Sequence, residues 1–138
     1  SMPEVEIFKE EVRAAARAQS PIPYTTTILG RKRRVKELNS KAWGPRGGAE
    51  RQIFNSKIQG SNADIIKKAM VLTHSRLPEG ADLLLTVHDE LIVQARDDRV
   101  EEAKAILEDA MVGEEIQSLL RVPIKTEAKI VSRWSEAK

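Results

Sequence analysis

Residues 83–95 read LLLTVHDELIVQA, which is the sharpest local pattern in the sequence. Two apolar runs of strand length, 83–87 and 91–95, are separated by only three residues that carry charge or titrate. Such a pattern predicts a β-hairpin, which we place over 82–95. Because both runs are apolar at nearly every position, we expect the hairpin to be buried on both faces or nearly so.

The tip of this hairpin holds His88, Asp89 and Glu90. Tight hairpin turns are usually built from Asn and Gly, so two adjacent carboxylates and an imidazole are unusual there. Mg²⁺ takes oxygen ligands from carboxylates and substrate phosphates, and a rigid turn would present such ligands. The tripeptide is therefore a candidate metal site. The alternative is a polar turn without chemistry.

The sequence around the hairpin predicts an α+β fold, in which an antiparallel β-sheet with hairpins is backed by helices in a single domain over 1–138. Helices are expected where apolar residues recur at helical spacing, and a last strand where they alternate. In order, we expect a helix over 3–19, a basic hairpin over 23–38, a glycine-rich loop over 39–48, a helix over 49–77, the hairpin over 82–95, a helix over 97–111 and a final strand over 122–131.

Positive charge is concentrated in residues 31–68. This window has eleven Lys or Arg and three acidic residues, a net charge of +8, whereas the whole chain carries +2. A basic block in a nearly neutral chain favours a polyanionic partner such as nucleic acid. A solvated basic surface is the alternative.

The predicted helix over 49–77 carries a stripe of hydrogen-bonding side chains. These lie at spacings of four, four and three residues: Arg51, Asn55, Gln59 and Asn62. The DNA minor groove presents acceptors at every base pair, so donors on one helix face could test pair shape without reading sequence. Gly60 would let a nucleic-acid strand approach the helix backbone. A solvated helix face is again the alternative.

Composition excludes several other classes. The chain has no cysteine, so it has neither disulfides nor thiolate metal sites. No stretch approaches the roughly 20 apolar residues of a membrane span, so we expect no membrane partner and an intracellular location, in the cytoplasm or nucleoid or in an organelle.

Four segments resemble family A DNA polymerases of the bacterial DNA polymerase I type. Residues 50–67, ERQIFNSKIQGSNADIIK, resemble that family's ER…N…QG-x-x-AD helix, and residues 24–34, YTTTILGRKRR, resemble the Y-x-x-T-x-x-GRRR segment before it. VHDEL at 87–91 matches the core of motif C, and VPI at 122–124 with Trp134 resembles the C-terminal strand and tail. The segments occur in the family's order over nearly the whole chain. This resemblance implies the C-terminal part of the catalytic palm.

The resemblance also implies roles for the hairpin tip. Asp89 corresponds to the palm carboxylate that binds two catalytic Mg²⁺ ions, and Glu90 to the neighbour that tunes this site. His88 corresponds to a residue that contacts the primer end. In a two-metal site the ions stabilise both the attacking and the leaving oxygens.

The implied DNA contacts come from two segments. Arg51, Asn55 and Gln59 correspond to residues that touch the minor groove of the newest base pairs. Arg31 and Arg33 are expected to meet backbone phosphates. The implied partners are primer–template DNA and, in a complete enzyme, a deoxynucleoside triphosphate.

Departures from the family pattern limit these expectations. Lys57 replaces a proline, and we expect it to straighten the helix and add a phosphate contact. Nothing matches motif A or the fingers helix, and no thumb is recognisable, so we expect a piece of a polymerase that is inactive without the other palm, fingers and thumb segments. A stand-alone, sequence-nonspecific duplex DNA-binding module is the alternative. Phage-type single-subunit RNA polymerases share the His and Asp of motif C but follow them with serine, so Glu90 favours a DNA polymerase.

Overall fold

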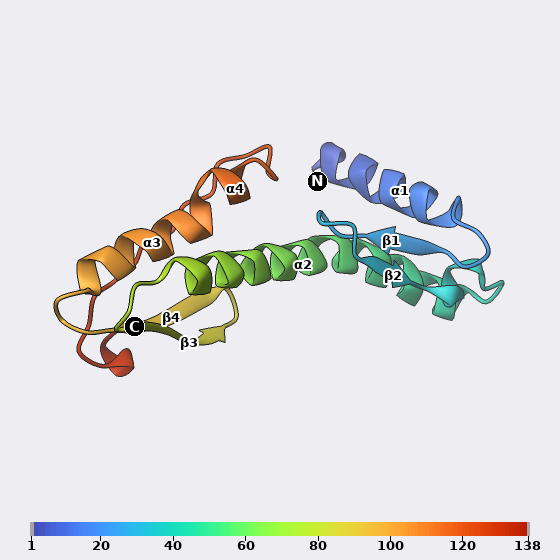
Figure 1. Cartoon of the computed structure of the whole chain (residues 1–138). Helices are drawn as coiled ribbons and strands as arrows, with labels where there is room; N and C mark the ends of the chain where they lie inside the picture. The colour runs from blue at the N-terminus through green and yellow to red at the C-terminus, as the bar shows by residue number, and fades with distance from the viewer. Residues whose placement is uncertain (1, 138) are drawn as a thin grey trace. The chain divides into compact units, whose positions relative to one another are not determined.

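The computed structural model describes residues 2–137 (Figure 1). Its elements are α1 (Pro3–Arg17), β1 (Tyr24–Thr26), β2 (Lys32–Arg34), the 3₁₀ helix η1 (Lys36–Asn39), α2 (Trp43–Arg76), β3 (Ala81–Val87), β4 (Glu90–Ala95), α3 (Val100–Val112), α4 (Glu114–Gln117) and the 3₁₀ helix η2 (Trp134–Glu136). The strands form two separate antiparallel pairs, β1–β2 and β3–β4. The α+β prediction, with antiparallel hairpins and helices, is confirmed. Among residues 2–137, no helix combines the length and apolar character needed to cross a bilayer.

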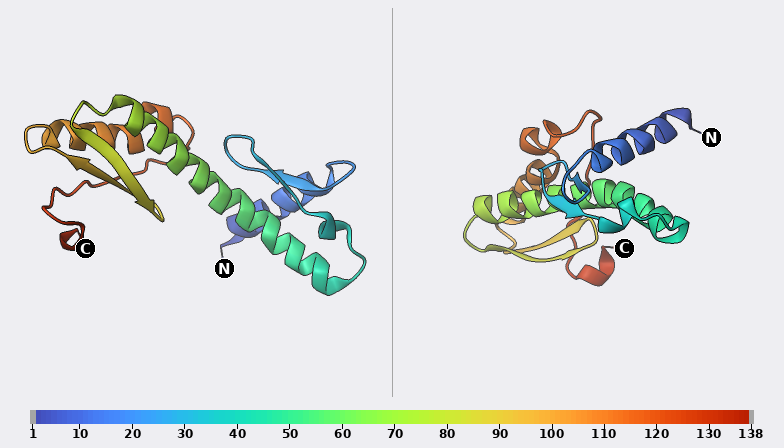
Figure 2. Two further views of the ribbon diagram at one scale, coloured as in Figure 1. Left: turned by 60° about the horizontal axis from the view of Figure 1, so that its bottom comes forward. Right: turned by 90° about the vertical axis from the view of Figure 1, so that its right-hand side faces the viewer.

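Where the sequence suggested one domain, the chain divides into two compact units, one ending at Asp64 and the other beginning at Ile65. In the first unit, α1 and the β1–β2 hairpin lie against the N-terminal half of α2 (Figure 2). The hairpin pairs Tyr24 with Arg34 and Thr26 with Lys32. Its core brings together small and branched apolar side chains from α1, the η1 region and α2: Val12, Ala16, Val35, Leu38, Ala49 and Ile53.

The long helix α2 begins at Trp43, so the predicted loop over 39–48 is wrong for its second half. Glycine costs about 1 kcal/mol relative to alanine inside a helix, which is why the glycines at 44, 47 and 48 suggested a loop. Pro45 is tolerated because it lies in the first turn, where backbone N–H groups have no partner within the helix. Tertiary packing offsets the cost of the glycines, because Ala49 and Ile53 on the following turns are buried in the core of the first unit.

The second unit contains the C-terminal part of α2, the β3–β4 hairpin, α3 and α4 (Figure 1). Its most buried residues come from all of these elements: Ala69, Thr73, Ala81, Leu91, Ala103, Ala110 and Ile116. The helix expected over 97–111 begins only at Val100, because residues 97–99 form a turn in which the Arg99 N–H donates to the Arg96 carbonyl at 2.8 Å. Arg76 holds α2 to the following helices through bonds to Asp109 (2.9 Å) and Glu115.

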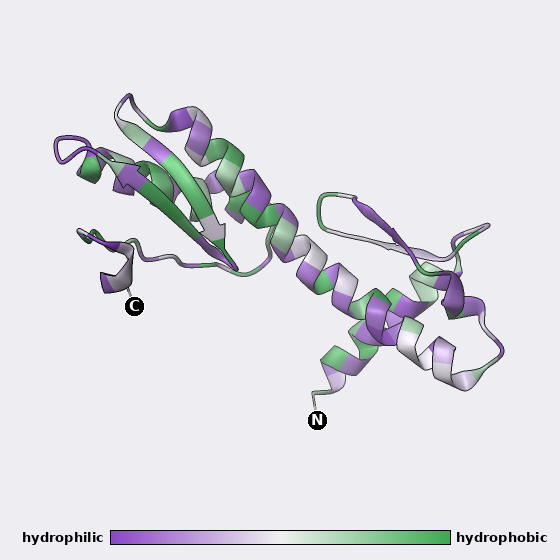
Figure 3. Ribbon diagram, turned by 90° about the horizontal axis from the view of Figure 1, so that it is seen from below, coloured by the Kyte–Doolittle hydropathy of each residue, from purple (hydrophilic) through white to green (hydrophobic). Residues whose placement is uncertain are grey.

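The expected burial of the β3–β4 hairpin on both faces is wrong for the described residues. Leu84 is 53% exposed and Leu85 39% exposed. The sheet has only two strands, so the outer edge of each strand has no strand partner among residues 2–137, and the register shifts between Leu83 and Leu85. In Figure 3 much of β3 and β4 is coloured as hydrophobic, so the exposed Leu84 and Leu85 belong to largely apolar strands.

The final strand predicted over 122–131 is also wrong, because this segment has no strand partner among residues 2–137. The alternation that suggested it is present, since residues 124, 126 and 128 are half-buried between exposed neighbours. Side chains replace the backbone ladder: the Ile124 N–H donates to Gln117 Oε1 at 3.2 Å and the Ala128 N–H to Glu108 Oε1 at 3.1 Å. The segment is extended along the helices without joining a sheet.

Candidate nucleic-acid interface

The tip of the β3–β4 hairpin is a two-residue turn formed by His88 and Asp89. Val87 pairs with Glu90, so Glu90 is the first residue of β4 and lies outside the turn. His88 has φ of 55°, in the left-handed region that non-glycine residues seldom occupy. Thr86 Oγ1 donates to the Glu90 carbonyl at 3.0 Å and ties the two strands together beside the turn. Backbone geometry of this kind often occurs where a side chain must be held in a fixed direction for function.

The side chains of His88, Asp89 and Glu90 are exposed, and none has a hydrogen-bond or ion-pair partner within residues 2–137. Two adjacent carboxylates fit a hard divalent cation, which prefers oxygen ligands. They do not form a complete site, since no group of three or more His, Cys, Asp or Glu in the described part of the chain is placed to hold a metal ion. Any ion held here would take its other ligands from water, from phosphates or from groups beyond this chain.

The stripe predicted on the long helix lies in the part of α2 that belongs to the first unit. Its four side chains are exposed: Arg51, Asn55, Gln59 and Asn62. None of them has a hydrogen-bond or ion-pair partner among the described residues. At about 100° per residue these positions fall within one narrow sector of the helix surface. The stripe therefore presents one guanidinium and three amides to solvent on one face.

A second stripe, at positions 57, 60, 61 and 64, faces the basic hairpin. Lys57 Nζ donates to the Thr26 carbonyl at 3.2 Å, so it reaches the hairpin backbone where a phosphate contact was expected. The Ile28 N–H donates to Ser61 Oγ at 2.9 Å. From the helical period, this stripe lies on roughly the opposite side of α2 from the exposed donors. The hairpin thus packs on the side of α2 that faces away from the exposed donor stripe.

Gly60 lies on the side of α2 that contacts the hairpin, so the expectation that it admits a nucleic-acid strand is wrong. A Cβ added to Gly60 would lie 2.8 Å from Cγ2 of Thr27 and 3.5 Å from an Arg31 nitrogen. The space is already filled by the hairpin. The close backbone approach that Gly60 permits is made by the chain's own Thr27.

The two arginines expected at phosphates differ in their surroundings. Arg33 is exposed on β2, and its guanidinium has no hydrogen-bond or ion-pair partner among the described residues. The Arg31 side chain is also exposed, at 54%, but it is bound within the chain: its Nε donates to Asp64 Oδ1 at 2.9 Å and its Nη2 donates to the Gly60 carbonyl at 3.1 Å. Sequence reasoning missed this network. The signal was present, since Asp64 is the only acid between residues 51 and 68 and lies seven residues after Lys57, on the same helix face.

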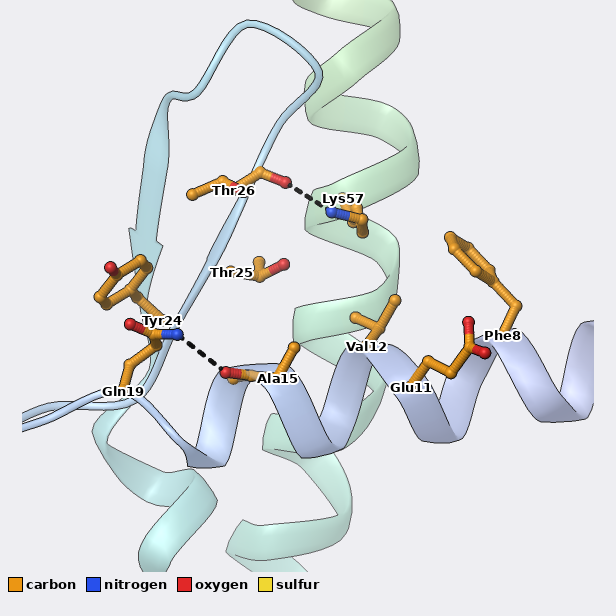
Figure 4. A pocket seen from close by; sticks show the side chains of 10 residues that line it. Phe8, Glu11, Val12, Ala15, Gln19, Tyr24, Thr25, Thr26 and Lys57 are labelled. Atoms are coloured by element: carbon orange, nitrogen blue, oxygen red, sulfur yellow. Dashed lines mark hydrogen bonds between the residues drawn. The ribbon is translucent and has the colours of Figure 1, made fainter. Parts of the chain in front are cut away.

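An open hollow of about 450 Å³ lies between α1, β1 and α2 (Figure 4). Its lining includes Phe8, Glu11 and Val12 from α1, with Lys57 reaching across toward the Thr26 carbonyl. Glu11 is the only acid in the lining, and the lining has no histidine or cysteine. With one carboxylate, the lining does not provide the several carboxylate, imidazole or thiolate ligands that hold a metal ion.

Comparison with known proteins gives a consistent result. A family model for DNA polymerase family A matches residues 1–136. DNA polymerase I proteins from Thermus filiformis and Bacillus caldotenax are 41% and 39% identical to the chain over its whole length, which is 16% and 15% of theirs. DNA polymerase I of Pseudomonas aeruginosa is 37% identical over 98% of the chain.

A solved structure is similar as well. The POL domain of Pol1 from M. smegmatis, in complex with DNA primer-template and dNTP, is 32% identical to the chain, with a TM-score of 0.74. The match covers 89% of this chain and 21% of that one.

Proposed function

The chain belongs to DNA polymerase family A, and from that membership we propose that it forms the C-terminal part of the catalytic palm of a DNA-directed DNA polymerase. It spans about 16% of the length of Thermus filiformis DNA polymerase I, so the polymerase activity belongs to a larger assembly of segments. The observation that carries the proposal is the family match over residues 1–136 together with an exposed, unpartnered donor stripe on α2.

The hairpin tip supplies the acidic part of the chemistry. Asp89, with Glu90 beside it, would hold Mg²⁺ at a turn whose direction is fixed by the β3–β4 pairing. When bound in pairs, such ions lower the barrier to attack by the primer 3′-hydroxyl and stabilise the leaving pyrophosphate. His88 is exposed at the same turn, where its imidazole can donate a hydrogen bond to the primer end.

The donor stripe supplies the contacts to DNA. The side chains of Arg51, Asn55 and Gln59 carry N–H donors that suit purine N3 and pyrimidine O2 in the minor groove. These acceptors occur at every base pair, so the contact would sense correct pair geometry and not sequence. Exposed cations such as Arg33 would add contacts to backbone phosphates.

A stand-alone duplex-binding module without catalysis is the second candidate. Two observations favour it: the donor stripe and the basic hairpin lie in one compact unit, and the carboxylates in the described residues do not form a complete metal site. Both candidates require duplex binding. Only the first requires Asp89 for nucleotidyl transfer.

The shared requirement is tested by titrating the 138-residue chain against a fluorescent duplex with a recessed 3′ end. We expect Asn55→Ala and Gln59→Ala to weaken binding on every sequence tested. The matched control is Gln94→Ala, which removes an exposed, unpartnered amide from β4. Equal binding by Gln59→Ala and the unaltered chain would show that the stripe is a solvated face.

A further inference from the structure

We propose that Arg31 is a positioning residue that holds the basic hairpin against the back of α2 and acts on DNA only through the donor stripe on the opposite face. The inference rests on the proposed duplex contact of that stripe. It replaces a phosphate contact for Arg31 with an internal role, and it separates Arg31 from Arg33, which lies only two residues away.

The contacts of Arg31 close a turn and attach it to the helix. Its backbone N–H donates to Thr27 Oγ1 at 3.1 Å, and the Thr27 N–H donates to the Arg31 carbonyl at 3.0 Å. The Thr27 hydroxyl in turn donates to Asp64 Oδ2, while Arg31 Nε donates to Oδ1 of the same carboxylate. The carboxylate of Asp64 therefore accepts hydrogen bonds from both ends of the turn, Thr27 and Arg31.

The carboxylate that accepts these bonds is buried. Asp64 is 7% exposed and Thr27 8% exposed, so the carboxylate is stabilised by hydrogen bonds and opposite charge in place of water. A charged donor to a carboxylate forms a stronger bond than a neutral one. The Gly60 carbonyl receives a further Arg31 N–H at 3.1 Å, so one planar guanidinium bridges two sites on the helix. A lysine ammonium would be a point charge without this fixed fork.

The same side chain is poorly suited to a phosphate contact. Two of its three nitrogens are already engaged by Asp64 and Gly60, and its charge is paired at 2.9 Å. Its helix contacts, Gly60 and Asp64, lie about 100° and about 140° around α2 from Gln59. Both arginines are exposed, but the guanidinium of Arg33 has no hydrogen-bond or ion-pair partner among residues 2–137.

The test measures affinity of the 138-residue chain for the recessed duplex between 50 and 200 mM salt, at a temperature where circular dichroism shows every variant folded. Each phosphate contact contributes about 0.9 to the slope of log K against log salt. We expect Arg31→Ala to weaken binding about fivefold or more with the slope unchanged, as coupled neighbouring sites allow. Arg33→Ala should lower the slope by about 0.9.

A double-mutant cycle measures whether the affinity losses of two substitutions are coupled. A residue that only stabilises the fold would show no such coupling with Gln59. In the Arg31→Ala background, Gln59→Ala should cost much less affinity than in the unaltered chain, because the stripe is already misplaced. In the Arg33→Ala background it should cost its full amount. Arg31→Lys keeps the charge and is the milder variant, and it should reproduce the loss of affinity without a change in slope.

Two results would overturn the inference while leaving the proposed function intact. One is a slope that falls for Arg31→Ala as much as for Arg33→Ala. The other is full additivity between Arg31→Ala and Gln59→Ala. If the unaltered chain does not bind the duplex at all, the proposed function fails and the positioning role fails with it.

Discussion

Gly60 of α2 and Thr27 of the basic hairpin approach so closely that a Cβ on the glycine would lie 2.8 Å from Thr27 Cγ2. Thr27 cannot easily give way, because it is buried and its hydroxyl donates to Asp64. The position of the hairpin on the helix therefore depends on a residue without a side chain. This relationship explains a glycine in the middle of a 34-residue helix, where propensity alone disfavours it.

Replacing this glycine should destabilise the chain. Gly60→Ala gains up to about 1 kcal/mol of helix propensity but forces overpacking that typically costs about 1–3 kcal/mol. We expect a net loss of about 1 kcal/mol in the free energy of unfolding, measured by urea denaturation.

The matched control is Gly48→Ala on the same helix, where an added Cβ meets nothing within 4 Å. There the propensity gain is unopposed, so the variant should be more stable by about 0.5–1 kcal/mol. If both glycine variants stabilise the chain equally, the close contact between hairpin and helix is not present in solution.

Duplex binding by the unaltered chain should be independent of sequence and should weaken steeply with salt. Residues 31–68 carry +8, and each cation that neutralises a phosphate releases condensed counterions. Anisotropy titrations on several duplexes of equal length at increasing salt would measure both properties. A preferred sequence, or an affinity that does not respond to salt, would contradict a footing on backbone and minor groove.

Metal binding by the chain alone should be weak. Asp89 and Glu90 provide one or two carboxylates, and Mg²⁺ held by so few groups without substrate phosphates stays largely hydrated. We expect calorimetry to give dissociation constants in the millimolar range for Mg²⁺ and Mn²⁺, weakened further by Asp89→Ala. Asp82→Ala, at an exposed aspartate of the same hairpin, is the control and should change nothing. Tight binding of two ions would mean that these carboxylates suffice without a second acidic segment.

The sequence specified local structure better than contacts between segments. Periodicity located both hairpins and the long helix, whereas the tip predicted at residues 88–90 is a turn of His88 and Asp89 alone, since Glu90 pairs with Val87. It failed where tertiary packing overrides propensity, as in the glycine-rich start of α2, whose following residue Ala49 is buried. It also failed for residues 122–131, because alternation specifies an extended chain and cannot specify a neighbouring strand. The ion pair between Arg31 and Asp64 was not foreseen for a related reason: charge in a basic run indicates a polyanion, and the sequence does not locate a buried partner such as Asp64.

Primer extension tests whether Asp89 belongs to a polymerase active site. We expect the chain alone to extend no primer, because two-metal phosphoryl transfer also needs a second metal-binding carboxylate and groups that hold the nucleotide, and we assign only Asp89 to the metal site. A chimera in which residues 1–136 replace the matching segment of Thermus filiformis DNA polymerase I should extend primers, and Asp89→Ala in this chimera should abolish extension while Asp82→Ala preserves it. A chimera that extends primers equally well with and without Asp89→Ala would contradict the account and leave the hairpin tip a polar turn.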